Sequence, residues 1–369
     1  MPKTTETVLE IDLTALGKNY HYLKSRIKDT TKLLGVVKAF AYGSDAVIIA
    51  KELEALGVDY LAVAYVNEGV ILRDVGIKTP ILVLHPQPEN FETLIDRCLE
   101  PSLYNESVLK QFIKIASEKK QLNYPVHLKF NTGLNRLGFN EAEVDKIISE
   151  LNATSTIKIT SLFSHLAASE DLTEKYFSQS QISTFKNIAK NISSKLSYQP
   201  KLHMSNTSGI LNYPEAQFDM VRSGIGLYGF SNIPEEQKNF IPIATLKSVI
   251  SQIHTIKKGD SVGYNRAFKS EGTIVTATIP IGHADGISRA YGNGKGWVMV
   301  QGIKAPIIGN VCMDMMMVNI TGIVCKEGDE VIVFGGNNKA DLLAESIESI
   351  SYELLTAISQ RVKREVCRK

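Results

Sequence analysis

The sequence has no apolar run long enough to cross a membrane. None of its segments approaches the roughly 18 consecutive apolar residues that a spanning helix requires. The first residues, Met1 to Glu10, are polar and lack the apolar core of a secretory signal. These two absences predict a cytoplasmic protein.

Cysteine is scarce, and the pattern of the few cysteines present matches no known type of site. Cys98, Cys312, Cys325 and Cys367 are scattered, without a C-x-x-C pair and without a histidine at metal-ligand spacing. In a cytoplasmic chain, cysteines are usually free thiols. We therefore expect neither a disulfide framework nor a bound metal.

The sequence also lacks an excess of charge of either sign. Its 41 Lys and Arg residues nearly balance its 39 Asp and Glu residues, and the formal net charge is +2. Proteins that bind nucleic acids or membrane surfaces concentrate Lys and Arg on one face. We therefore expect no nucleic-acid or membrane partner. A length of 369 residues exceeds what one core usually holds, so two domains are expected.

The first 240 residues contain a repeating pattern, in which short apolar runs alternate with longer amphipathic stretches. The runs are too continuous for half-exposed strands and are typical of buried parallel strands. They are Leu33–Lys38, Tyr60–Tyr65, Pro80–His85, Pro101–Tyr104, Val126–Phe130, Ile159–Phe163, Lys201–Ser205 and Met220–Ser223. The clearest helical stretches between them are Asp45–Leu56, Asn67–Val75, Glu106–Lys119 and Glu174–Ile192.

This alternation predicts an α/β fold with a TIM-like (β/α)8 barrel over residues 1–240. A doubly wound open sheet is the alternative, but it would carry a Gly-rich phosphate loop after its first strand, and none is present. An opening helix is expected around Leu16 to Ile27, capped by Asp12 or Thr14.

After about Phe240 the pattern changes to strand-like runs separated by turn residues, followed by a closing helix near Leu342–Ser359. We therefore expect a mainly β C-terminal domain over residues 241–369. The glycines at 292, 294 and 296 precede no helical pattern, so we interpret them as a loop rather than a nucleotide site.

Lys38 is the first candidate for chemistry, because it ends a buried run and reactive groups of a (β/α)8 barrel lie where strands end. Burial of a charged lysine there is unfavourable unless the amine is paired with an anion or used in a covalent bond. A lysine that reaches the rim of the barrel with its amine in water is the alternative.

Nine blocks of sequence, in order, resemble the motifs of alanine racemases. The block around Lys38, Val-Val-Lys-Ala-Phe-Ala-Tyr-Gly, is similar to the family's pyridoxal-phosphate (PLP) lysine motif, which usually has Asn at the place of Phe40. The blocks are Val36–Gly43, His127–Gly138, Leu162–Ala167, His203–Ser208, Val221–Gly229, Val262–Arg266, Ile281–Gly286, Val311–Asp314 and Tyr352–Glu353.

The resemblance implies a PLP enzyme that interconverts L- and D-alanine with two bases. Lys38 would hold PLP and act on one face of Cα, and Tyr264, reaching the site from the other subunit of a homodimer, would act on the opposite face. His165 and Arg222 would form a relay with Tyr264 that favours the phenolate, since tyrosine has an unperturbed pKa of about 10. Without this resemblance, His165 and Tyr264 would be interpreted as residues that pack in the core.

In the family, an arginine at the place of Arg222 hydrogen-bonds the pyridine nitrogen of PLP. Because arginine keeps its protons, it leaves that nitrogen unprotonated, so the ring stores carbanion charge poorly. Related barrel decarboxylases have an acid there. The resemblance at Arg222 therefore implies a racemase.

The remaining contacts are implied by the same resemblance. The substrate carboxylate would be held by Arg136 and the main chain of Met313. Lys129 matches a lysine that is carbamylated in parts of the family; a salt-bridged or surface lysine is the alternative. The cofactor contacts, besides Lys38, His165 and Arg222, would be Tyr42, Asn206, Thr207, Gly224, Ile225 and Tyr352.

The sequence departs from the family at several positions, none of which removes a catalytic group. The substitutions near the substrate entrance weaken the expectation of strict alanine specificity, although Arg289 is retained. A serine or broad-specificity racemase is therefore one alternative. A non-catalytic PLP-binding protein is another, although such proteins resemble only the barrel part and lack the β domain that carries Tyr264 and Met313. D-alanine would supply peptidoglycan precursors or be degraded. The departures are Asn131 for Asp, Ser223 for Pro, His283 for Tyr and Asn310 for Arg.

Overall fold

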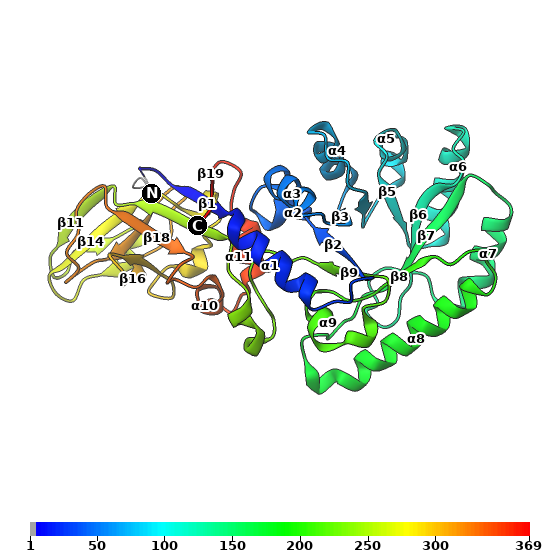
Figure 1. Ribbon diagram of the computed structural model, residues 1–369. Coiled ribbons are helices and arrows are strands. Elements are labelled where there is room, and N and C mark those ends of the chain that lie inside the picture. The colour runs from blue at the N-terminus through cyan, green and yellow to red at the C-terminus, as the bar shows by residue number, and fades with distance from the viewer. Residues whose placement is uncertain (1–4) are drawn as a thin grey trace. The chain divides into compact units, whose positions relative to one another are not determined.

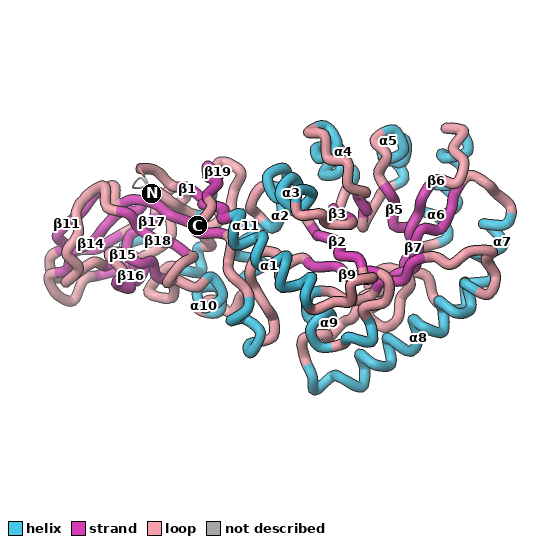
Figure 2. The backbone as a smooth tube through the Cα atoms, in the orientation of Figure 1, coloured by secondary structure: helices cyan, strands magenta, loops and turns pink. Residues whose placement is uncertain are grey.

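The computed structural model describes residues 5–369, which form two compact units (Figures 1 and 2). The first, here called the barrel unit, consists of Gly17–Ala41 and Ala46–Ile241. The second, the β unit, consists of residues 5–16, Tyr42–Asp45 and Pro242–Lys369.

The barrel unit is built on a closed barrel of parallel strands in the order β2 to β9. All eight predicted runs are strands of this barrel, and the predicted fold class is confirmed. Neighbouring strands bury their side chains on both faces, which explains the continuous apolar runs. The strands are β2 (Lys32–Val36), β3 (Tyr60–Val63), β4 (Ile81–Val83), β5 (Glu100–Leu103), β6 (Tyr124–Lys129), β7 (Ile157–Phe163), β8 (Lys201–His203) and β9 (Met220–Ser223).

Helices connect the strands and flank them (Figure 2). In the longest helix, α8 (Lys175–Ser193), the buried residues Ile182, Phe185, Ala189 and Ile192 recur at helical spacing, so one face packs inward. The other helices are α1 (Leu13–Ser25), α2 (Lys38–Tyr42), α3 (Ala46–Ala55), α4 (Val66–Asp74), α5 (Phe91–Asp96), α6 (Glu106–Glu118), α7 (Val144–Asn152) and α9 (Thr207–Asn212).

The described chain begins with a strand, β1 (Val8–Asp12), which the sequence analysis did not predict. This strand pairs with β10 and β19 of the β unit, so its hydrogen bonds place it there, whereas the predicted first domain, 1–240, included it. Residues 1–4 of that predicted domain lie outside the described residues. The following helix begins as predicted, because Asp12 Oδ1 accepts hydrogen bonds from the main-chain nitrogens of Thr14 (2.9 Å) and Ala15 (3.2 Å).

The β unit contains a nine-stranded sheet in the order β11-β14-β17-β16-β15-β18-β10-β1-β19. It is mainly β, as expected. A separate two-stranded sheet pairs β12 with β13. The strands after β9 are β10 (Ala244–Val249), β11 (Gln252–Ile256), β12 (Ser261–Val262), β13 (Phe268–Lys269), β14 (Ile274–Ile279), β15 (Trp297–Val300), β16 (Ile303–Ile308), β17 (Met316–Asn319), β18 (Glu330–Phe334) and β19 (Lys363–Cys367).

The single closing helix expected near residues 342–359 is instead two short helices, α10 (Ala340–Glu345) and α11 (Ser351–Ala357). Between them Glu348 adopts a positive φ of 60°, which a continuous right-handed helix excludes. The glycines at 292, 294 and 296 lie in a loop that leads into β15, as interpreted from the sequence. Among residues 5–369 no helix combines the length and the apolar character that crossing a membrane requires.

Candidate active site

Basic side chains gather in the barrel unit near the ends of its strands. Lys38 follows β2, Lys129 ends β6, His165 follows β7 and Arg222 lies in β9. Arg136, from the loop after β6, is close enough to lower the pKa of each of these groups. The only acid among the causes of these pKa shifts is Glu68, which acts on Lys38. The cluster is therefore a site for anions.

Lys38 is followed by a left-handed turn. Ala39, Phe40, Ala41 and Tyr42 have φ between 52° and 54°. A left-handed conformation costs an L-residue about 1–2 kcal/mol, so such a run persists only where its surroundings hold it. At its end, Gly43 (φ 79°) lies so close to α11 of the same unit that a Cβ would be 1.9 Å from the carbonyl oxygen of Leu355. Only glycine fits there.

Glu68, in the first turn of α4, fixes the start of this turn. Its Oε1 accepts a hydrogen bond from the main-chain nitrogen of Ala39 at 2.7 Å. Its Oε2 accepts from the nitrogens of Ala64 (2.6 Å) and Tyr65 (3.1 Å), which follow β3. One carboxylate thus joins the end of β3 to the residue after Lys38.

The amine of Lys38 is half-buried, and burial together with Arg136 lowers its pKa, while Glu68 raises it. Lys129 is more affected. Burial, followed by Arg136, Arg222 and Lys38, lowers its pKa to about 8. Lys129 is only 7% exposed and makes no ion pair within the described residues, so it is neither a surface lysine nor a salt-bridged one.

Arg222 is buried and held by several acceptors. Its Nη2 donates to the carbonyl oxygens of Ser164 (2.7 Å) and Met204 (2.9 Å) and to Nδ1 of His165 (3.0 Å). Its Nη1 donates to Nδ1 of His203 at 2.7 Å. Burial and Arg136 lower the pKa of Arg222 to about 9, so the guanidinium remains charged at neutral pH.

These contacts define the state of His165. Burial and the neighbouring Arg222 lower the pKa of His165 well below its usual value, so the ring is neutral. Because an arginine only donates, Nδ1 of His165 must accept, and the proton lies on Nε2. His165 therefore presents an N–H donor on the side away from Arg222.

The loop after β9 and the start of α9 together form a cradle of hydrogen-bond donors. Thr207 Oγ1 lies 3.0 Å from Ser223 Oγ. A Cβ on Gly226 would be 2.6 Å from the Thr207 methyl group, so glycine is required for this approach. Within the described chain, the main-chain N–H groups of Gly224 and Ile225 donate to no acceptor, which leaves them available to a ligand. Asn206 caps α9 through Gly209 (2.8 Å) and also accepts from Ser169 (2.8 Å).

The β unit carries the other residues singled out in the sequence. The rings of Tyr42 and Tyr352 lie 6.0 Å apart, and burial followed by Tyr352 raises the pKa of Tyr42. Tyr264 and Met313 are 71% and 59% exposed. They border one surface hollow, lined also by Cys312, Met315 and Met317. Asn310 donates to the carbonyl oxygen of Tyr264 at 3.3 Å.

The loop that carries Met313 is held by an ion-pair bridge. Arg361 donates to Asp285 Oδ1 (2.7 Å) and to Asp314 Oδ1 (2.6 Å). Asp285 in turn accepts from the nitrogen of Gly282 at 2.8 Å. A Cβ on Gly282 would lie 2.4 Å from the carbonyl oxygen of Met313, so the two segments could not approach this closely with any other residue.

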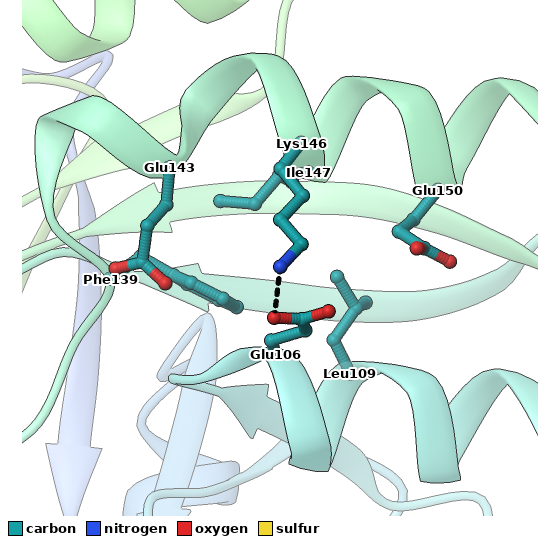
Figure 3. Close-up of a pocket in the computed structure, with 7 residues that line it drawn as sticks. All are labelled: Glu106, Leu109, Phe139, Glu143, Lys146, Ile147 and Glu150. Carbon is teal, nitrogen blue, oxygen red and sulfur yellow. Dashed lines mark hydrogen bonds and ion pairs between the residues drawn. The ribbon is translucent and has the colours of Figure 1, made fainter.

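A second charged cluster lies between α6 and α7 (Figure 3). There Lys146 pairs with Glu106, and Lys110 lies 2.7 Å from Glu106 and 3.3 Å from Glu150. The charges of this cluster neutralise one another across the two helices. It is a contact between helices and does not share the excess of positive charge found around Lys38.

Comparison with known protein families shows to which family a chain with this anion site belongs. The model of the alanine racemase N-terminal domain matches residues 11–232, and that of the alanine racemase C-terminal domain matches residues 243–366. The chain belongs to the alanine racemase family. It is an isomerase of that family, as the motifs predicted.

Individual relatives match over nearly the full length. The alanine racemase of Sorangium cellulosum is 34% identical, with 97% of this chain and 98% of the relative covered. The solved alanine racemase of Clostridium difficile 630 is 34% identical with a TM-score of 0.93, covering 99% of this chain and 97% of the other. The alanine racemase of Bartonella henselae, solved with covalently bound pyridoxal phosphate, is 28% identical with a TM-score of 0.89, covering 99% and 100%.

The structure brings part of the predicted site together. Two groups gather in the barrel unit, the basic cluster and the donor cradle, whereas the remaining predicted residues belong to the β unit. Sequence reasoning missed Glu68, whose only signal was an acid in the first turn of the helix after β3. The barrel unit holds Lys38, Lys129, Arg136, His165, Asn206, Thr207, Arg222, Gly224 and Ile225; the β unit holds Tyr42, Tyr264, His283, Arg289, Asn310, Met313 and Tyr352.

Replacement of Glu68 tests its electrostatic action on Lys38. We expect Glu68→Gln to lower the pKa of Lys38 further, because it removes the one negative charge that raises this pKa. The pKa would be measured by 13C NMR titration of lysine-labelled, cofactor-free protein, with Lys38→Met to assign the signal. Glu89→Gln, an exposed acid elsewhere at the barrel, is the matched control. An unchanged or higher pKa of Lys38 in Glu68→Gln would contradict this account.

Proposed function

We propose that this enzyme racemises alanine with PLP as cofactor, and that Lys38 and Tyr264 are the two bases. The observation that carries the proposal is the cluster of Lys38, Lys129, Arg136 and Arg222 at one end of the barrel with Glu68 as its acid. Such a cluster suits an anionic cofactor together with the carboxylate of a substrate.

The residues present fit PLP. The phosphate would be held by the main-chain N–H groups of Gly224 and Ile225 and by the Thr207 hydroxyl, which is the donor set that a phosphate requires. Arg222 Nε, which donates to no acceptor among the described residues, would serve the ring nitrogen. When bound, PLP stores the electron pair that remains after the α-proton leaves.

The remaining cofactor contacts are proposed from the family pattern. Asn206 caps the helix that begins with Thr207 and so keeps the hydroxyl in place. Tyr42 and Tyr352 would contribute their hydroxyl groups to the phosphate. The high pKa of Tyr42 keeps its phenol protonated and therefore a donor.

Lys38 is suited to act as a base on one face of the substrate. Burial and Arg136 lower its pKa, so a larger fraction of the amine is neutral and able to take a proton at physiological pH. The left-handed turn and Glu68 hold the residue that follows it. Lys38 can therefore attach the cofactor and then, once free, accept the α-proton.

Tyr264 would act as the base on the opposite face of the substrate. His165 and Arg222 would make this possible by favouring its phenolate form. His165 is neutral with its proton on Nε2, so it can donate to the Tyr264 oxygen and favour the phenolate. The charge of Arg222, one hydrogen bond further, acts in the same direction. In this proposal the relay is what allows Tyr264 to act as a base.

We propose that the enzyme works as a homodimer with two equivalent sites, each completed by Tyr264 and Met313 of the other subunit. Both side chains are exposed and border an apolar hollow rich in methionine, which is typical of a surface that a partner covers. The substrate carboxylate would be held by Arg136, which is exposed and makes no ion pair within the described residues, and by the main chain of Met313.

Alanine is the proposed substrate, and cytoplasmic D-alanine for peptidoglycan precursors the proposed product. Relatives support this. The alanine racemase of Bacillus anthracis has been solved with bound L-Ala-P, and that of Clostridium difficile 630 in complex with cycloserine. His283 and Asn310 at the predicted entrance leave a serine or broad-specificity racemase as the competing proposal, so L-serine belongs in the assay.

A mixing experiment tests the reaction and the shared site together. We expect the wild type to form D-alanine from L-alanine, faster than D-serine from L-serine, and Lys38→Ala and Tyr264→Phe to be inactive. A mixed dimer of the two variants carries one intact site, so random mixing should restore about a quarter of the wild-type activity. Chiral chromatography measures the product.

The outcomes of this experiment are distinct. No D-alanine from the PLP-loaded wild type would contradict the reaction. Preference for L-serine would contradict the substrate. Inactive variants that stay inactive after subunit exchange would show that Tyr264 acts within its own chain, and an active Tyr264→Phe would contradict its role as a base.

Lys129 is proposed to carry a carbamate. The neutral amine attacks the carbon of CO2, one C=O bond becomes C–O⁻, and the displaced amine proton passes to solvent. The modification replaces a buried cation beside Arg136 by an anion that pairs with it. Because only the neutral amine reacts and the pKa of Lys129 is about 8, formation should rise as the pH is raised through that value.

We expect 13C NMR with 13C-labelled bicarbonate to show one protein-bound carbamate that disappears in Lys129→Ala. Lys146, which pairs with Glu106 on the outside of the barrel, provides the control, and Lys146→Ala should retain the signal. A carbamate signal that survives Lys129→Ala, or none in the wild type above pH 8, would contradict the assignment.

A further inference from the structure

The inside of the barrel contains a chain of hydrogen-bonded polar side chains where such barrels usually hold branched apolar residues. Glu100 Oε2 lies 2.7 Å from Nε2 of His127, and Nδ1 of His127 lies 2.6 Å from Ser161 Oγ. Ser161 Oγ lies 2.9 Å from Nε2 of His203, whose Nδ1 lies 2.7 Å from Nη1 of Arg222. We call Glu100, His127, Ser161 and His203 the barrel chain.

The barrel chain crosses the interior of the barrel through neighbouring strands. Glu100 is the first residue of β5, whereas Arg222 is the third residue of β9. His127, Ser161 and His203 come from β6, β7 and β8, and all three are fully buried. A buried polar group without a partner destabilises the fold, so each of these groups depends on its neighbours in the chain.

The end at Arg222 fixes the state of His203. A guanidinium only donates, so Nδ1 of His203 must accept. The ring is neutral, since burial and Arg222 lower the pKa of His203 well below its usual value. The proton of His203 therefore lies on Nε2, and this N–H donates to Ser161 Oγ.

The hydrogen bonds keep the same donor-to-acceptor direction from His203 to Glu100. Ser161 Oγ accepts from His203, and its own hydroxyl proton has one acceptor left, Nδ1 of His127. His127 then carries its proton on Nε2 and donates it to the carboxylate of Glu100. Along the chain, Arg222, His203, Ser161 and His127 each donate one hydrogen bond to the next member, and Glu100 accepts the last one.

We propose that the barrel chain is a positioning device for Arg222, in which Glu100, His127, Ser161 and His203 fix the guanidinium and connect its charge to a remote carboxylate. The proposal rests on the role of Arg222 at the cofactor proposed above. Glu100, His127, Ser161 and His203 are positioning residues, since they act through Arg222 and not on the substrate.

The chemistry of Arg222 and its packing against Phe163 both indicate that the chain positions Arg222 and does not transfer protons. Arg222 has no lone pair with which to receive a proton, so the chain ends at Arg222 and cannot conduct protons to the site. The ring of Phe163 stacks on His203 with 4.8 Å between ring centres, and the guanidinium carbon of Arg222 lies 5.4 Å from the same ring. Phe163 thus holds both partners of the Arg222–His203 hydrogen bond.

The direction of the chain is tested by 15N NMR of the PLP-loaded, histidine-labelled full-length protein. We expect His127 and His203 to be neutral, each with its proton on Nε2. Signals are assigned by comparison with His127→Gln and His203→Gln. A proton on Nδ1 of either ring, or a doubly protonated His203, would overturn the proposal. This NMR measurement does not depend on enzymatic activity. It would test the direction of the hydrogen bonds even if the enzyme did not racemise alanine.

The middle of the chain is tested with Ser161→Ala, which removes two hydrogen bonds and little volume. We expect the fixed protonation of His203 to be lost, kcat to fall about ten-fold and KM for alanine to stay within about two-fold, because Arg222 is misplaced while the substrate contacts remain.

Ser102→Ala is the matched control, since Ser102 is buried in β5, the strand that begins with Glu100, and its hydroxyl has no hydrogen-bond partner within the described residues. It should behave as the wild type in both measurements. Wild-type kcat and unchanged histidine signals in Ser161→Ala would overturn the proposal, as would an equal loss of kcat in Ser102→Ala. If Ser161→Ala does not fold, the wild-type spectrum alone still tests the direction.

Discussion

The excess of positive charge at one end of the barrel is the constraint on which the site depends. Burial and the charge of Arg136 lower the pKa of Lys38, Lys129 and Arg222, and the only acid among the causes of these shifts is Glu68. Repulsion of this size is unfavourable in the free protein and is relieved when anions bind. Burial and this repulsion together lower the pKa of Lys38 and Lys129, which leaves a larger fraction of each amine neutral and reactive.

Such a cluster needs rigid supports, because side chains that repel one another would otherwise turn away. Glu68 fixes the left-handed turn after Lys38 from one side, and Gly43 allows the end of that turn to pack closely against Leu355. Arg222 is held by main-chain carbonyl groups, by His165 and by the barrel chain. The strand ends of the barrel supply the fixed positions from which these supports act.

The sequence alone predicted the barrel well, because buried parallel strands carry continuous apolar runs that alternate with helical patterns. It did not predict the left-handed turn at 39–42, whose Ala, Phe and Tyr residues give no sign of positive φ. Nor did it predict β1, which owes its conformation to pairing with distant strands. Tyr264 and Met313 could be singled out only by resemblance, since an exposed tyrosine and methionine carry no signal of their own. The barrel chain was invisible for a similar reason: its members are adjacent only in the folded barrel.

The most direct test of the central claim is to find where the cofactor attaches. The PLP-loaded protein would be reduced with borohydride, digested and analysed by mass spectrometry for the lysine that carries the pyridoxyl group. The account predicts that Lys38 carries it, because burial and the nearby Arg136 lower the pKa of its amine. Modification of Lys129 or of a surface lysine, with Lys38 unmodified, would contradict the account.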